Sequence, residues 1–158
     1  MKKINRPIGY GVVLSILILL VACSNGKQDS QNKPLTEHQL KYGIGPIEDV
    51  QVGAIDRQIA TAGQRYFQSN CAKCHMLDRP LLGPPLRDVA NRRTPEFIMN
   101  MILNPQEMVM RHPILQDYQK QYNIFMTTQG MNRGIARAIL EYLRQVAPDK
   151  TAEKGASG

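Results

Sequence analysis

The feature that most constrains this chain is a pair of cysteines three positions apart, Cys71 and Cys74, with His75 directly after the second. Such a cluster is typical of a redox-active dithiol, a metal site, a disulfide or a covalently attached prosthetic group. A thioredoxin-like dithiol needs a βαβ context, and no stretch alternates apolar and polar residues for long enough to predict a strand. A structural zinc site needs four ligands, but the sequence offers no second CxxC pair and only His38 and His112 as further histidines.

The first 22 residues have the pattern of a secretory signal. Three basic residues precede an almost unbroken apolar run from 8 to 21, which is too short for a comfortable transmembrane span. The run ends in Leu-Val-Ala-Cys, which resembles the lipobox of bacterial lipoproteins. We therefore expect removal of residues 1–22, lipidation of Cys23, and a folded part anchored to a membrane in the periplasm or cell envelope. An uncleaved signal anchor would give the same topology.

The remaining length leaves room for one small domain with tails on either side. Residues 24–33 contain no apolar side chain, so we expect a tether there. Residues 34–55 are broken by Gly43, Gly45 and Pro46, which favours an extended segment on the domain surface. The sequence thus predicts a tether and extended segment over 23–55, a domain over 56–147 and a disordered tail over 148–158.

Within the domain, N-capping residues and prolines predict only helices. The predicted helices begin after Asp56, run over 95–103 behind Thr94, begin at Pro105 with Glu107 at the capping-box position, run over 113–122, and begin after Asn132. Gly63 interrupts the apolar face of the first helix. Because glycine weakens a helix interior, we expect another helix to approach closely there.

A covalent haem is the interpretation that uses the whole cysteine–histidine motif. A plain disulfide would leave the adjacent histidine unexplained. In CxxCH the two thiols add to the vinyl groups of haem, and the histidine binds the iron. In an exported, all-helical chain we therefore predict one haem c, attached through Cys71 and Cys74, with His75 as the proximal ligand.

The residues around this motif resemble the class I cytochromes c. Gly63-x-x-x-Phe67-x-x-x-Cys71 resembles the N-terminal helix of that family, and residues 138–144 look like its C-terminal helix. The resemblance covers roughly residues 56 to 147. It implies an all-α class I cytochrome c fold, in which the two terminal helices cross at Gly63, the haem pocket lies between them, and extra helices separate the haem motif from the methionine loop.

The family also has a loop after the haem motif, which Gly83-Pro84 matches. The resemblance implies that the carbonyl of Pro84 accepts a hydrogen bond from Nδ1–H of His75. This would turn Nε2 of the ring toward the iron and raise the basicity of the ligand. Arg92 and Arg93 precede the middle helix, and we expect them to contact the haem propionates or to remain solvated.

The sixth iron ligand is predicted to be Met126. It stands in a non-helical stretch shortly before the last helix, where the family carries its axial methionine. Many members have proline after that methionine, whereas Thr127 follows here, so Met110, Met131 and a bis-histidine site with His112 stay open. Six apolar side chains are expected to exclude water from the iron, namely Leu81, Leu82, Leu86, Ile98, Ile102 and Phe125.

These features predict an electron-transfer protein rather than an enzyme. Without the expected signal, 17 basic and 13 acidic residues leave a formal net charge of about +4, which fits docking to an acidic partner and is also ordinary for a soluble domain. The basic residues are scattered, so the sequence shows no nucleic-acid signature. We expect a monomer that passes single electrons from a membrane donor to a periplasmic acceptor.

Short stretches such as YGIGPI resemble cytochromes of bacterial denitrification, which implies a copper-containing nitrous oxide reductase as acceptor, although a terminal oxidase would fit equally. The alternatives are a haem enzyme or gas sensor with an open sixth site, and a fixed haem subunit of a respiratory complex.

Overall fold

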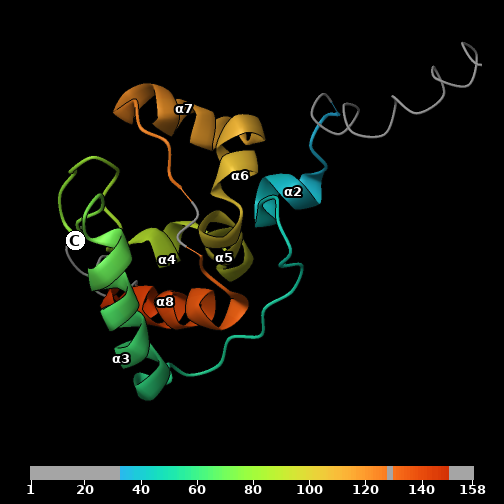
Figure 1. The fold of residues 1–158 in the computed structure, drawn as a ribbon. Coiled ribbons are helices and arrows are strands. Elements are labelled where there is room, and N and C mark those ends of the chain that lie inside the picture. The colour runs from blue at the N-terminus through green and yellow to red at the C-terminus, as the bar shows by residue number, and fades with distance from the viewer. Residues whose placement is uncertain (1–32, 128–129, 150–158) are drawn as a thin grey trace, which may run out of the picture. The chain divides into compact units, whose positions relative to one another are not determined.

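The computed structural model describes residues 33–127 and 130–149. The predicted signal over 1–22, the lipidated Cys23 and the last nine residues lie outside this range. From Leu35 the described chain forms a compact helical unit (Figure 1). None of the helices in these two ranges is both long enough and apolar enough to cross a membrane.

The described elements are all helical, as predicted. In chain order they are α2 (Glu37–Tyr42), α3 (Arg57–Tyr66), a π-helical turn (Phe67–Cys71), α4 (Val89–Arg92), α5 (Pro95–Leu103), α6 (Pro105–Arg111), α7 (Pro113–Tyr122) and α8 (Arg133–Val146). The side chains of Asp56, Thr94 and Asn132 accept backbone N–H bonds at the starts of α3, α5 and α8. These polar groups satisfy the free N–H groups of a first helical turn, which explains why the predicted helix starts are confirmed.

The capping box expected at α6 does not form. Asn104 makes no side-chain cap bond to the helix. Its Nδ2 donates instead to Oε2 of Glu107 at 3.0 Å and to the carbonyl of Ile44 at 3.1 Å. The Asn104 side chain is therefore held by the Ile44 carbonyl and by Glu107, and it does not cap the first turn of α6.

The crossing of α3 and α8 is the centre of the fold, and Figure 1 shows the two helices passing over each other. A Cβ atom on Gly63 would lie 1.8 Å from the carbonyl oxygen of Ala138, so only glycine permits this approach. One turn later Phe67 packs on Tyr142, with ring centroids 5.3 Å apart. The close approach expected at Gly63 is confirmed.

The expectation of an extended surface segment over 34–55 holds for its end, where residues 51–55 are exposed and outside any helix, and is wrong for the part before it. Thr36 starts helix α2 with a full capping box, in which its side chain and that of Gln39 each accept the other's backbone N–H. Beyond α2, Ile44 and Ile47 are buried in two hydrophobic clusters. We call residues 35–53 the N-terminal strap.

Side chains from distant helices bind the backbone of the N-terminal strap. Asn100 on α5 is fully buried and makes three such bonds, from the Ile47 N–H and to the carbonyls of Ile47 and Tyr42. On α8, Arg137 and Arg144 donate to strap carbonyls at 3.0 and 2.7 Å while both also pair with the buried carboxylate of Glu141. The strap is thus part of the same compact unit as the helices.

Candidate functional site

A deep, mostly apolar pocket opens between the cysteine–histidine turn and the later helices. Its walls come from the π-helical turn and the chain up to Leu86, from α4, α5, α7 and α8, and from the segment 124–127. The cavity has a volume of about 220 Å³. A concave, mostly apolar lining with a few polar groups is typical of small-molecule and cofactor sites.

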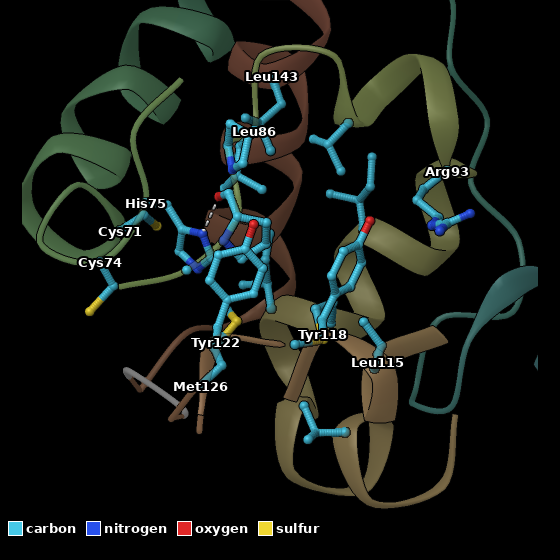
Figure 2. A pocket seen from close by; sticks show the side chains of 18 of the residues that line it. Cys71, Cys74, His75, Leu86, Arg93, Leu115, Tyr118, Tyr122, Met126 and Leu143 are labelled. Atoms are coloured by element: carbon cyan, nitrogen blue, oxygen red, sulfur yellow. Dashed lines mark hydrogen bonds between the residues drawn. The ribbon is translucent and has the colours of Figure 1, made fainter. Parts of the chain in front are cut away.

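The π-helical turn brings both cysteines and the histidine to this pocket. The N–H groups of Cys74 and His75 donate to the carbonyl of Cys71 at 3.0 and 2.8 Å. This tight turn follows directly on the helix that Gly63 fixes against α8. All three side chains line the pocket, as Figure 2 shows.

The hydrogen bond expected between His75 and Pro84 is present. Nδ1 of the ring lies 2.9 Å from the Pro84 carbonyl oxygen (Figure 2). Because a carbonyl only accepts, Nδ1 carries the proton and Nε2 keeps its lone pair. Gly83 stands close beside the ring, since a Cβ there would lie 2.5 Å from Cε1 of His75. The Gly-Pro pair therefore both orients the imidazole and makes room for it.

Burial sets the protonation of these side chains. Removal from water lowers the pKa of His75, and the bond to Pro84 opposes this only in part. The neutral imidazole, which is the form that binds metals, is thereby favoured. Burial also raises the pKa of the Cys71 thiol to about 11, with a further contribution from Cys74. Cys71 therefore stays a neutral thiol until it reacts.

Met126 lines the same pocket as His75, whereas the alternatives for the sixth position do not. Met110 is exposed, and Met131 is partly buried against the main hydrophobic cluster. His112 is buried outside the pocket, where its Nε2 lies 3.0 Å from the Leu40 carbonyl. Met101 of α5 also contributes to the wall. The structure thus brings together the cysteines, His75 and Met126.

Both candidate propionate partners are at the pocket as well. Arg92 donates to the carboxylate of Asp88 at 2.9 Å and to the hydroxyl of Tyr118 at 3.2 Å. Arg93 holds its guanidinium 5.4 Å from the ring centroid of Phe97. Their place in the wall suits either role expected of them, as partners of an anionic group or as solvated charges.

The expected apolar wall is correct in part. Leu86, Ile98, Ile102 and Phe125 line the pocket, although Phe125 is 62% exposed. Leu81 and Leu82 do not line it and are 44% and 51% exposed. Backbone bonds from Leu81 to Gly83 and from Gly83 to Cys74 close their loop tightly, and both leucines are left in solvent.

Helix α7 supplies wall residues that the sequence analysis missed. Leu115, Gln119 and Tyr122 follow one another at helical spacing and all line the pocket. Their spacing of i, i+4 and i+7 places them on one face of the helix, and this pattern could have predicted a shared wall. Oε1 of Gln119 is buried without a hydrogen-bond partner.

These residues fit a covalent haem. Two thiols on one turn can bond its two vinyl groups, and a neutral imidazole with its Nδ1 engaged presents Nε2 to the iron. A methionine in the wall offers a thioether, and two arginines offer donors for carboxylates. Elsewhere in the described ranges, no group of three or more His, Cys, Asp or Glu side chains is placed to hold a metal ion.

Comparison with known proteins agrees with this geometry. The family model described as "Cytochrome c" matches residues 60–147. A cytochrome c from Rhodothermus marinus is 45% identical, with a TM-score of 0.67 over 70% of this chain and 96% of that one. An engineered form of that cytochrome is 43% identical with the same TM-score, over 71% of this chain and 98% of that one. No curated protein matches the chain at a significant level.

Proposed function

Because the chain belongs to the cytochrome c family, we propose that it passes single electrons from a membrane donor to a periplasmic acceptor through a haem held between His75 and Met126. Family membership establishes the class I fold, one covalently bound haem c and an electron-transfer role. The two ligands, the anchor and the partners are the proposal. The observation that carries it is that His75, oriented by Pro84, lines one pocket with Met126.

The haem supplies a reversible one-electron couple at its iron. The protein's contribution is to fix both ligands and to keep water out. Pro84 holds the His75 ring in one tautomer, which keeps Nε2 available in either oxidation state. A thioether from Met126 together with the imidazole of His75 and the apolar wall would favour the ferrous form of a bound haem and so raise its reduction potential.

Met126→Ala is the direct test of ligation. We expect the purified ferric variant to lose the weak red charge-transfer band typical of thioether-ligated haem, and the reduced variant to bind carbon monoxide. Met110→Ala, at an exposed methionine, is the matched control and should behave like the wild type. An unchanged ferric spectrum in Met126→Ala would show that another residue binds the iron.

The same measurement separates a carrier from a haem enzyme or gas sensor. An engineered cytochrome c from Rhodothermus marinus, 43% identical to this chain, has been solved bound to a carbene intermediate, so the enzyme alternative needs its own test. An open or displaceable sixth position in this chain would appear as rapid carbon monoxide binding by the reduced wild type. That result would overturn the carrier proposal.

Membrane attachment is proposed through lipidation of Cys23. The lipobox-like sequence before this cysteine supports it. We expect the mature protein to carry acyl chains on Cys23, detectable by mass spectrometry, and Cys23→Ser to be released from membranes. A stoichiometric complex after mild detergent extraction would favour a fixed subunit over a mobile carrier.

For the acceptor, we propose a copper-containing nitrous oxide reductase, which the YGIGPI-type stretches support. Mixing the reduced protein with such a reductase should oxidise the haem faster than mixing with a terminal oxidase. Faster oxidation by the oxidase would reverse the assignment.

A further inference from the structure

Two short stretches of chain, residues 74–78 and residues 83–87, lie side by side at the base of the exposed loop 79–82. Three backbone bonds join them, from the Gly83 N–H to the Cys74 carbonyl at 2.9 Å, from the Leu86 N–H to the Met76 carbonyl at 3.0 Å, and from the Arg87 N–H to the Leu77 carbonyl at 3.0 Å. We call these three bonds the loop ladder. The bond between His75 Nδ1 and the Pro84 carbonyl, drawn dashed in Figure 2, falls between the first two of them in chain order. The position of the Pro84 carbonyl therefore depends on how firmly the loop ladder is closed.

The side chain of Arg87 extends the loop ladder and links it to α8. Its Nε and Nη2 donate to the two carboxylate oxygens of Asp78, the second of these bonds at 2.8 Å. Its Nη1 donates at 3.2 Å to the carbonyl of Val146, which ends α8 and has no partner within the helix. A two-point bond between a guanidinium and a carboxylate fixes direction as well as distance. Arg87 thus ties the loop ladder to the helix that crosses α3 at Gly63.

The ion pair lies at the surface, where its effect on stability is small. The side chains of Arg87 and Asp78 are 41% and 67% exposed. Exposed ion pairs contribute little to the free energy of unfolding, because water screens the charges and two long side chains lose freedom. The contacts of Arg87 therefore matter more for where the ends of the loop lie than for the stability of the whole protein.

We propose that Arg87 is a positioning residue for the proximal ligand, which it serves by holding the Pro84 carbonyl against Nδ1–H of His75. This rests on the proposed ligation of the iron by His75. A hydrogen bond at Nδ1 raises the basicity of a metal-bound imidazole. A more basic ligand stabilises ferric iron over ferrous iron, so the closed loop ladder lowers the reduction potential.

Lysine in place of Arg87 would keep the charge and lose the geometry. An ammonium is a point charge without the planar fork of arginine, so it cannot bind both oxygens of Asp78 in a fixed direction while it reaches Val146. The ends of the loop would then move more freely, and the bond between His75 and Pro84 would weaken.

The test compares Arg87→Lys with the wild type as holoproteins, by potentiometry and by proton NMR of the reduced form. We expect a higher midpoint potential, which lost charge cannot cause because the charge is conserved. We also expect the Nδ1 proton of His75 to exchange faster with deuterium from the solvent, and the melting temperature to stay close to that of the wild type. Arg79→Lys, at an exposed arginine of the same loop, is the matched control and should change none of the three.

Each other result overturns the assignment. An unchanged potential or an unchanged exchange rate in Arg87→Lys would show that Pro84 is held without the guanidinium. Equal changes in Arg79→Lys would show a general effect of the loop's basic side chains. If Arg87→Lys fails to retain haem, Asp78→Asn takes its place, since it removes one of the two acceptor oxygens, and unchanged exchange there refutes the proposal. The wild-type NMR spectrum is read first, because His75 ring protons without the strong shifts of a haem ligand would refute ligation by His75 rather than the role of Arg87.

Discussion

Replacement of Asn100 by alanine should destabilise the protein by detaching the N-terminal strap. The side chain is fully buried and makes three hydrogen bonds of 2.9–3.0 Å to strap backbone groups. Each bond contributes about 1 kcal/mol, and the N–H and carbonyl of Ile47 would remain buried without partners, at about 1–3 kcal/mol. Allowing for partial relaxation, we expect a loss of about 3–5 kcal/mol in the free energy of unfolding.

Urea unfolding of the holoprotein, followed by far-ultraviolet circular dichroism, measures this loss. For a slope of about 2 kcal/mol/M, the midpoint should fall by about 2 M. Asn91→Ala is the matched control, because Asn91 makes one exposed bond, to the Pro148 carbonyl at 2.9 Å, and should cost less than about 1 kcal/mol. Equal losses in the two variants would refute the argument that Asn100 holds the strap.

Three further perturbations test other contacts. Gly63→Ala puts a Cβ against the α8 backbone and should lower the free energy of unfolding of the holoprotein by about 1–3 kcal/mol or more. Thermal unfolding measures this loss, and a melting temperature equal to that of the wild type would contradict the close approach. Gly83→Ala displaces the proximal imidazole and should alter the ferric Soret spectrum, whereas an unchanged spectrum would show that the loop yields easily. The hydrogen bond from Asn104, and after it the one from Arg111, lowers the pKa of Glu107 in the folded protein. The stabilisation by ionised Glu107 is therefore fully present above the ordinary carboxyl pKa of about 4.5 and is lost as the pH falls through the lower pKa of the folded state. Glu107→Gln should therefore be less stable than the wild type at neutral pH, by under about 1 kcal/mol, and this gap should close in acid titrations of the melting temperature.

The parts of the site that local sequence could predict are those made by neighbours in the chain. The CxxCH turn closes through bonds within a few residues, and the bond from His75 to Pro84 spans only nine positions. The starts of α3, α5 and α8 could be predicted for the same reason, because the side chains of Asp56, Thr94 and Asn132 accept hydrogen bonds from backbone N–H groups in the first turn of their own helices.

The N-terminal strap could not be predicted in the same way. Its glycines and proline look like a surface loop, and the side chains that bind its backbone lie 46 to 91 positions away on α5 and α8. The sequence around a polar residue such as Asn100, inside an apolar helix pattern, does not indicate which distant backbone groups it will bind. The prediction that Leu81 and Leu82 line the pocket failed for a related reason, because hydrophobicity alone does not tell which side of a tight loop faces solvent.

The long separation between the N-terminal strap and its partners has a consequence for the order of folding. The strap leaves the ribosome well before its partners Asn100 and Arg144 are made. Closing such long loops is entropically costly and tends to follow local helix formation. We expect Asn100→Ala to speed unfolding while leaving the folding rate nearly unchanged, and a slowed folding rate would contradict this. The strap is thus synthesised before the helices that hold it but docks after they form, and the haem-attachment turn that follows it in the chain can form before the domain is finally closed.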